Sequence, residues 1–262
     1  RVQKFDSDGN HVSSFGYFGA DTGLFSIPMG IAIGTDGKIY VADSGNHRIQ
    51  SFTSNGVFIS TFGSFGTGPG QFNSPRGLTL DGNGNIYVVD RENHRIQSFN
   101  SAGVFVNSFG SIGSGDGQLH YPNGVAFDAT GNIYVTDQNN NRIQKFNSAG
   151  TYVSVLGEPL LQHPDGFAID AAGNIYVVDR GNRSIKSFNS AGVFVNSFGS
   201  NGSAIGQFNS PNGIAITANG KILVTDTENH RVQIIGVLSP PHTLNLNGVT
   251  VSGTNSLTIL DN

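Results

Sequence analysis

The sequence predicts an all-β fold, and within that class a six-bladed β-propeller with four-stranded antiparallel blades. Three observations predict it: a unit that recurs along the chain, a hydrophobic period of two inside each unit, and a composition dominated by turn residues. The 262 residues include 37 glycines and nine prolines, and only 12% are charged. This composition excludes a helical bundle, and no apolar run approaches the roughly 18 residues of a membrane-spanning helix.

The repeat is marked by one glycine in each copy, at intervals of 47, 47, 42 and 47 residues. An aspartate follows each glycine after 13 residues. The glycines are Gly30, Gly77, Gly124, Gly166 and Gly213, and the aspartates are Asp43, Asp90, Asp137, Asp179 and Asp226. The constant internal spacing predicts that every copy folds in the same way.

A sixth copy is divided between the two ends of the chain. Gly248 stands 13 residues before Asp261, and the segment 1–16 aligns with 48–63, which places Arg1 opposite Arg48. We therefore expect a composite blade of residues 247–262 and 1–16. Its tail strands 249–251 and 257–260 would pair with the strands 1–5 and 12–15. Pairing of residues 1–16 with residues 243–262 would then close the ring.

Each complete copy contains four strand-like segments. In the second copy these are 77–80, 86–89, 96–99 and 104–109, and the connections DGNGN, DRENHR and NSAG are rich in turn residues. One such sheet cannot bury both of its faces, whereas sheets stacked around an axis can. The alignment predicts one domain, 1–262, with complete blades at about 28–63, 75–110, 122–157, 164–199 and 211–246.

The run G-N-I-Y-V-x-D followed by N-H-R-I-Q resembles the NHL-repeat β-propeller family. N-H-R-I-Q occurs at 46–50 and 93–97, and its variant N-H-R-V-Q at 229–233. The resemblance covers residues 1–236 and is weaker in the tail. It implies a propeller fold and, in most members, a protein-binding or RNA-binding platform or scaffold. A minority of the family are enzymes, such as amidating lyases.

Residues that recur in every blade are interpreted as scaffold, because a catalytic group is needed only once. Asp90 and Arg95 stand five residues apart, as do their counterparts in three other copies, and are expected to tie the loop after the second strand. The fourth copy reads D-R-G-N-R-S-I-K, with Ser184 in place of the arginine and Arg183 one position early, which predicts an irregular loop. Recurrent asparagines suit positive-φ or side-chain-to-backbone turn roles, and recurrent phenylalanines an inter-blade core. The asparagines are Asn46, Asn93, Asn140, Asn182 and Asn229, and the phenylalanines are Phe52, Phe99, Phe146 and Phe188.

A calcium loop is the alternative at residues 6–10, which read D-S-D-G-N. The segment aligns with the hairpin turns of the other copies, and Tyr17 occupies the position where a calcium loop needs a bidentate glutamate. The sequence therefore favours a hairpin turn.

A functional site is expected where the copies differ, at the start of the innermost strands beside the central channel. These ligand-binding candidates are Met29, Arg76, Asn123, Asp165, Asn212 and Asn247. The loop after each second strand should open on the same face and form an outer ring of Ser44, Arg91, Gln138, Arg180 and Thr227.

The function predicted from these residues is a binding or scaffold module, not an enzyme, that presents a polar face to a protein or glycan. We expect no cofactor, no membrane insertion, and a monomeric domain of a larger exported protein, extracellular or periplasmic, on a bacterial surface. One alternative is a metal-assisted lyase or hydrolase at the channel mouth, with a divalent metal held by His120, His163 and Asp165. The second is RNA binding, against which the net charge of −4 argues.

Overall fold

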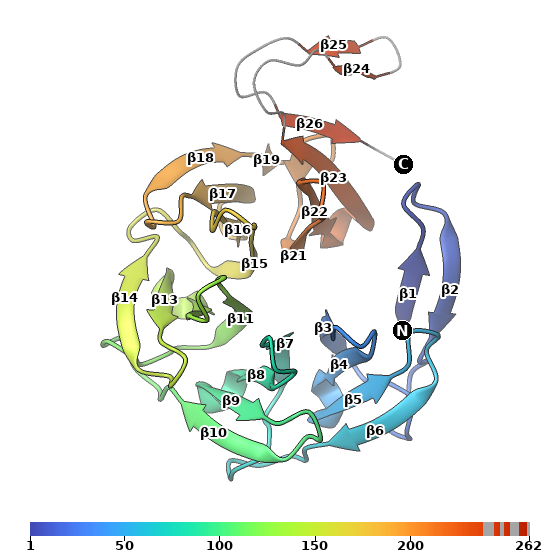
Figure 1. Ribbon diagram of the computed structural model, residues 1–262. Helices are drawn as coiled ribbons and strands as arrows, with labels where there is room; N and C mark the ends of the chain where they lie inside the picture. The colour runs from blue at the N-terminus through green and yellow to red at the C-terminus, as the bar shows by residue number, and fades with distance from the viewer. Residues whose placement is uncertain (238–243, 247–248, 252–256, 261–262) are drawn as a thin grey trace. The chain divides into compact units, whose positions relative to one another are not determined.

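The computed structural model describes residues 1–237, 244–246, 249–251 and 257–260. In these residues the repeat forms five four-stranded antiparallel sheets, the blades of a β-propeller (Figure 1). The chain divides into two compact units, Arg1–Val155 and Leu156–Asn262. Among the described residues, no helix is long and apolar enough to cross a membrane.

The first unit holds three complete blades. Blade 1 consists of β3 (Pro28–Ile33), β4 (Ile39–Asp43), β5 (Arg48–Phe52) and β6 (Phe58–Phe62). Blade 2 consists of β7 (Pro75–Leu80), β8 (Ile86–Asp90), β9 (Arg95–Phe99) and β10 (Phe105–Phe109). Blade 3 consists of β11 (Pro122–Phe127), β12 (Ile133–Asp137), β13 (Arg142–Phe146) and β14 (Tyr152–Leu156). The first strands of successive blades, β3, β7 and β11, pack side by side.

The second unit holds two blades. Blade 4 consists of β15 (Pro164–Ile169), β16 (Ile175–Asp179), β17 (Ser184–Phe188) and β18 (Phe194–Phe198). Blade 5 consists of β21 (Pro211–Ile216), β22 (Lys221–Asp226), β23 (Arg231–Val237) and β26 (Leu257–Leu260). Between them lie the short parallel strands β19 (Ser200–Asn201) and β20 (Gln207–Phe208). A separate antiparallel pair consists of β24 (Leu244–Leu246) and β25 (Val249–Val251).

The hydrophobic core lies between blades, because each small sheet exposes two faces that only its neighbours can cover. Tyr40 and Ala42 of blade 1 share one buried cluster with Leu78, Ile86 and Val88 of blade 2. A second cluster joins blades 2 and 3, and in the other unit a third joins blades 4 and 5. The four recurrent phenylalanines are all buried, which confirms their prediction as core residues.

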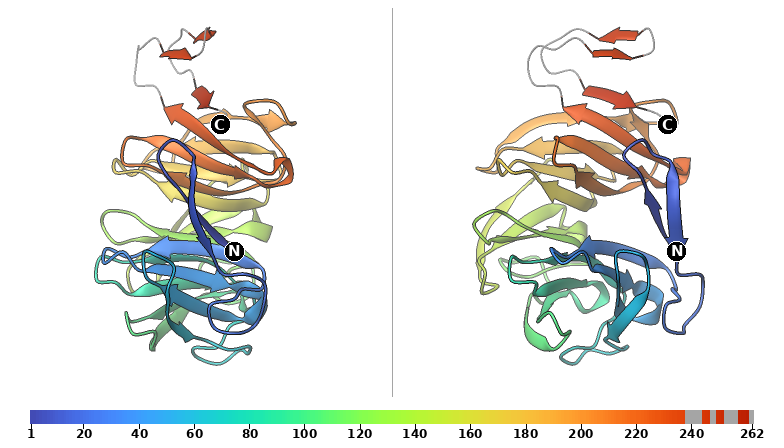
Figure 2. Two further views of the ribbon diagram at one scale, coloured as in Figure 1. Left: turned by 90° about the vertical axis from the view of Figure 1, so that its right-hand side faces the viewer. Right: turned by 45° about the vertical axis from the view of Figure 1, so that its right-hand side comes forward.

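The prediction of a sixth, composite blade was wrong for the described residues. The strands β1 (Val2–Phe5) and β2 (His11–Phe15) form a two-stranded sheet of their own, drawn in dark blue in Figure 2. The tail strand β26 pairs instead with β23, with Leu260 opposite Ile234, and so completes blade 5.

The sequence after β23 explains this difference. Where the other complete copies read N-S-A-G or T-S-N-G before their outermost strand, this copy reads G-V-L-S at 236–239, and two prolines follow at 240 and 241. Proline lacks the N–H that a hairpin needs, so this sequence disfavours a local outermost strand. The outer edge of β23 is therefore available, and residues 257–260 pair with it. Blade 5 takes its last strand from beyond the predicted boundary at 246.

The β1–β2 connection is a hairpin turn, as predicted. The Asp6 carboxylate accepts the backbone N–H groups of Asp8, at 3.0 Å, and Asn10, at 2.8 Å. These bonds, together with one from the Asn10 side chain, lower the pKa of Asp6. The Asp6 carboxylate therefore serves the turn itself.

Candidate functional site

In the first unit, two kinds of loop meet at one end of the blades, here called the loop face. The leading loops 16–27, 63–74 and 110–121 each run into the first strand of a blade. The 3-10 turns Ser44–Asn46, Arg91–Asn93 and Gln138–Asn140 each follow a second strand. They are joined by backbone hydrogen bonds, such as the one from the Glu92 N–H to the Asn73 carbonyl oxygen, at 3.1 Å.

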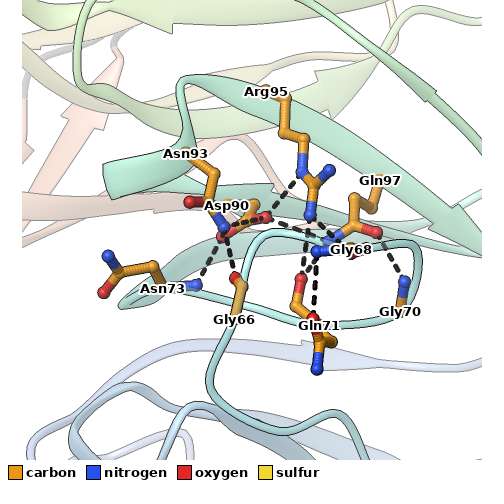
Figure 3. A network of polar contacts seen from close by, with 9 residues as sticks. All are labelled: Gly66, Gly68, Gly70, Gln71, Asn73, Asp90, Asn93, Arg95 and Gln97. Carbon is orange, nitrogen blue, oxygen red and sulfur yellow. Dashed lines mark hydrogen bonds and ion pairs between the residues drawn. The ribbon is translucent and has the colours of Figure 1, made fainter.

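A buried aspartate organises the loop face in blade 2 (Figure 3). Asp90 Oδ2 accepts hydrogen bonds from Arg95 Nε at 2.8 Å, Asn93 Nδ2 at 2.9 Å and Gln97 Nε2 at 3.0 Å. Asp90 Oδ1 accepts the backbone N–H of Asn73 at 2.7 Å. The charge of this carboxylate is thus paired and fully hydrogen-bonded, as burial requires.

The three side chains that bind Asp90 also hold the backbone of the leading loop, and this arrangement is here called the clamp (Figure 3). Arg95 Nη2 donates to the Gly68 carbonyl at 2.8 Å, and Asn93 Nδ2 donates to the Gly66 carbonyl at 2.8 Å. Gln97 Oε1 accepts the Gly70 N–H at 2.9 Å. The loop therefore has a fixed backbone although it is rich in glycine.

The clamp recurs in blades 1, 3 and 5, which confirms the scaffold interpretation of the aspartate and arginine. The Nε to Oδ2 distances are 2.8 Å for Arg48–Asp43, 2.8 Å for Arg142–Asp137 and 2.9 Å for Arg231–Asp226. Burial alone would raise the pKa of Asp226, but hydrogen bonds, including those from Asn209 N–H, Asn229 and Arg231, outweigh burial and lower it. The sequence analysis missed the glutamine, whose signal was its recurrence as Gln50, Gln97, Gln144 and Gln233.

Blade 4 anchors its loop differently. Asp179 still accepts a backbone N–H of the leading loop, that of Gln162, at 2.7 Å. It also accepts a hydrogen bond from the side-chain amide of Asn182, at 2.7 Å. Its cationic partner is Lys186, which stands where the other blades have glutamine, while Ser184 replaces the arginine. The described turn between β16 and β17 contains no 3-10 helix, which confirms the predicted irregularity.

The positive-φ residue of each turn is one position later than expected. The recurrent asparagines act through their side chains, whereas φ is 55° at His47, 54° at His94 and 57° at Asn141. The ring nitrogen Nδ1 of His94 accepts the backbone N–H of Tyr121 at 3.1 Å, and His47 accepts that of Ser74 at 3.0 Å. These histidines therefore tie one blade to the next.

The pKa of His94 is lowered because the imidazole is desolvated by burial and lies beside His120. The two ring centroids are 5.7 Å apart. A lowered pKa favours the neutral ring, and only a neutral ring offers Nδ1 as an acceptor.

The structure brings together some of the predicted ligand-binding residues of the first unit. Met29, Arg76 and Asn123 occupy the second positions of the adjacent strands β3, β7 and β11. Met29 lines a cavity of about 210 Å³ together with Val2 and Ile31.

The predicted outer-ring residues of the first unit reach the next blade. Ser44 Oγ lies 3.0 Å from Ser74 Oγ. Arg91 Nη2 donates to Gln138 Oε1 at 2.9 Å, and Arg91 also pairs with Glu92 at 2.7 Å. The Arg91 guanidinium stands 4.8 Å from the centre of the Tyr121 ring.

In the second unit, Asp165 is 1% exposed and accepts a hydrogen bond from Asn212 Nδ2 at 3.1 Å. Arg180 Nη1 lies 3.8 Å from the same carboxylate oxygen. Thr227 begins the 3-10 turn Thr227–Asn229, and Asn247 lies outside the described residues. In the described ranges, no group of three His, Cys, Asp or Glu residues is placed to hold a metal ion. Of the three residues of the alternative metal set, His120 belongs to the first unit, and His163 and Asp165 belong to the second.

Three exposed apolar residues of the leading loops were missed by the sequence analysis. Phe18 is 87% exposed, Phe65 66% and Ile112 62%. The sequence did carry a signal for them: an apolar residue directly before a glycine occurs three times, and the occurrences are 47 residues apart. The sequence pattern gave no indication of which side chains of these loops point to solvent.

The family assignment follows from this geometry and from a match to a family model. Four segments, 25–52, 72–99, 119–146 and 208–235, match the NHL repeat. Each match begins at the buried end of a leading loop and ends in a third strand. The matches leave out the fourth copy, whose clamp is altered. The chain belongs to the NHL-repeat β-propellers.

Solved structures share this fold at low sequence identity. A streptogramin B lyase superimposes with a TM-score of 0.65 at 18% identity, covering 94% of this chain and 71% of the lyase chain. A chain of a nidogen/laminin complex gives 0.63 at 22% identity, covering 79% and 75%. A gluconolactonase from Xanthomonas campestris gives 0.61 at 14% identity, covering 87% and 76%. No curated protein matches the chain by sequence.

Proposed function

We propose that the chain is a binding module that presents its loop face to a protein or glycan partner. The observation that supports this best is the clamp, which fixes the backbone of a long, glycine-rich loop by hydrogen bonds within the chain itself. A surface ordered in advance loses little conformational entropy when a partner docks. Rigid presentation is therefore the property that this part of the molecule supplies.

The side chains of the loop face favour a protein or glycan over RNA. Arg91 lies 2.7 Å from Glu92, and in the second unit Arg180 lies 3.8 Å from Asp165. Each of these arginines therefore has a carboxylate beside it, which reduces the positive potential that a phosphate backbone requires. The Arg91 guanidinium also donates to Gln138 Oε1 at 2.9 Å, so contacts within the chain already engage this cation.

The similar solved structures include both proteins named for an enzymatic activity and one chain from a complex between proteins. Their identities to this chain, 14% to 22%, give a likeness of fold alone. They leave the choice between binding and catalysis to experiment.

The test selects ligands for the immobilised protein from a phage-displayed random peptide library and from a panel of immobilised glycans. The affinity of each selected ligand is then measured for the double variant Arg91→Ala with Gln138→Ala. We expect a loss of at least tenfold. The control is Lys38→Ala, in the turn between β3 and β4 at the opposite end of the strands, which should leave the affinity unchanged.

The rival enzymatic function predicts a different result. If elemental analysis finds one metal ion per chain, and both His120→Ala and His163→Ala remove it, the result favours the metal-assisted alternative and contradicts the proposal. Failure of every peptide and every glycan to bind also contradicts the proposal.

A further inference from the structure

Three leading loops of the first unit share an exposed large apolar side chain at an equivalent position. These residues, Phe18, Phe65 and Ile112, are here called the apolar arc. They are 87%, 66% and 62% exposed. Because the loops run into β3, β7 and β11, which pack side by side, the three side chains belong to neighbouring loops of one face. Exposed apolar groups that form such a set indicate an interaction surface more often than isolated ones do.

The backbone under each of these side chains is fixed. Phe65 forms a parallel bridge with Phe72: the Phe72 N–H donates to the Ser64 carbonyl at 2.8 Å, and the Gly66 N–H donates to the Phe72 carbonyl at 3.1 Å. Asn93 of the clamp also holds the Gly66 carbonyl. The same bridges join Phe18 to Phe25 and Ile112 to Leu119.

The apolar side chains are not required by this loop geometry. The leading loop of blade 5 has the same bridge, between Asn201 and Phe208, and the same clamp contact, from Asn229 Nδ2 to the Gly202 carbonyl at 2.9 Å. At the position equivalent to Phe65 this loop carries a polar asparagine, Asn201, which is exposed. The bridge and the clamp contact therefore do not require apolar residues at 18, 65 and 112, although the Phe65 ring also lies 4.9 Å from the His47 ring, between centroids.

We propose that the apolar arc docks an extended polypeptide segment of a partner protein, with apolar side chains on the arc and basic residues beside them. This proposal rests on the binding function and selects protein over glycan. A sugar ring stacks on an aromatic face, and Ile112 has none. An apolar peptide side chain packs equally well against phenylalanine and isoleucine.

The acidic charge of the leading loops is the reason for proposing a basic partner segment. The leading loops 16–27, 63–74 and 110–121 contain Asp21 and Asp116 and no lysine or arginine. Lysine or arginine in the partner would meet these carboxylates at the rim of the apolar contacts, where opposite charges speed association and set orientation.

The experiment uses the full chain and a phage-displayed library of random 15-residue peptides. Peptides retained by the protein are sequenced, and their affinities are measured by fluorescence anisotropy for the protein and for the triple variant Phe18→Asn, Phe65→Asn, Ile112→Asn. Asparagine is chosen because position 201 already carries it in the same geometry. We expect selected peptides enriched in apolar and basic residues, and at least tenfold weaker binding to the triple variant. Circular dichroism and the melting temperature should be unchanged.

The matched control is Val106→Asn, which removes an apolar side chain that is 60% exposed on β10, away from the loop face. It should leave peptide binding intact. Equal affinity of the selected peptides for the protein and the triple variant overturns the proposal. So does a result in which only glycans bind, but glycan binding that is lost on Arg91→Ala with Gln138→Ala leaves the broader binding function standing.

Discussion

Blade 2 and blade 4 have the same four strands but hold their leading loops by different means. In blade 2, Asp90 is bound by Arg95 and Gln97, which also hold the 12-residue loop 63–74. In blade 4, Asp179 is bound by Lys186, and the loop is the short segment 157–163. In both blades the aspartate accepts the N–H of a loop residue just before the first strand. The aspartate is therefore needed by every blade, whereas arginine and glutamine are needed only where the loop is long.

Removing the charge of the blade 2 aspartate is expected to have the largest effect on stability. In Asp90→Asn the Arg95 guanidinium loses its buried counter-charge, and breaking such a pair costs about 3–5 kcal/mol. The free energy of unfolding, measured by urea denaturation, should fall by that amount. The comparison is made with Asp179→Asn, where the partner is the single flexible amine of Lys186. A loss at Asp179 as large as that at Asp90 would break the distinction between the two blades.

Exchanging the residues that bind the aspartate between blades 2 and 4 tests whether these residues depend on loop length. The expected effect is smaller. Arg95→Ser combined with Gln97→Lys gives blade 2 the residues of blade 4. Because the Gly68 carbonyl and the Gly70 N–H then lose their partners, we expect a loss of about 1–3 kcal/mol and faster hydrogen exchange within 63–74. The reverse exchange, Ser184→Arg with Lys186→Gln, should not slow exchange in the shorter loop 157–163. Unchanged exchange rates in blade 2 would show that the aspartate alone orders the loop.

The smallest expected effect is on how the free energy of unfolding depends on pH, through His94 of blade 2. The lowered pKa of His94 means that folding favours the neutral ring, so its contribution to stability is present above the ordinary histidine value of 6.5 and is lost as the pH falls through the lowered pKa. Blade 4 has Arg183 at this position in place of a histidine. In His94→Asn, which copies Asn141 of blade 3, the free energy of unfolding should decrease less between pH 7 and pH 5.

The control for this pH effect is Arg183→Asn, which should leave the pH dependence as it is in the unaltered protein. Urea denaturation at pH 7, 6 and 5 measures both variants. If His94→Asn retains the full dependence on pH, the titrating group lies elsewhere.

The sequence predicted those features that depend on local pattern. Strand positions followed from the period of two and from turn residues, and the predicted segment 86–89 became β8 (Ile86–Asp90). The scaffold role of Asp90 and Arg95 followed from their recurrence. Features that depend on competition between distant segments were not predictable in this way. Residues 257–260 read L-T-I-L, a strand-like segment whose sequence does not name its partner, and only the structure shows that it pairs with β23.

The sequence was equally unable to predict which side chains of a loop are exposed to solvent. Phe65 and Phe72 are both phenylalanines in one glycine-rich loop, yet Phe72 is buried and Phe65 is exposed. The difference arises from the bridge between them, which fixes the backbone while one ring enters the core between blades 1 and 2. The predicted positions Met29, Arg76, Asn123, Asp165 and Asn212 remain candidates for ligand contact.

Amide hydrogen exchange of Gly70 in the ligand-free protein tests the central claim most directly, namely that the leading loops are ordered before any partner binds. The Gly70 N–H donates to Gln97 Oε1 at 2.9 Å, in a loop without a strand of its own in the described residues. We predict that this amide exchanges about as slowly as the amides inside β8. Exchange at the rate of an unstructured peptide would show a loop that is mobile until it is bound, and would contradict the account.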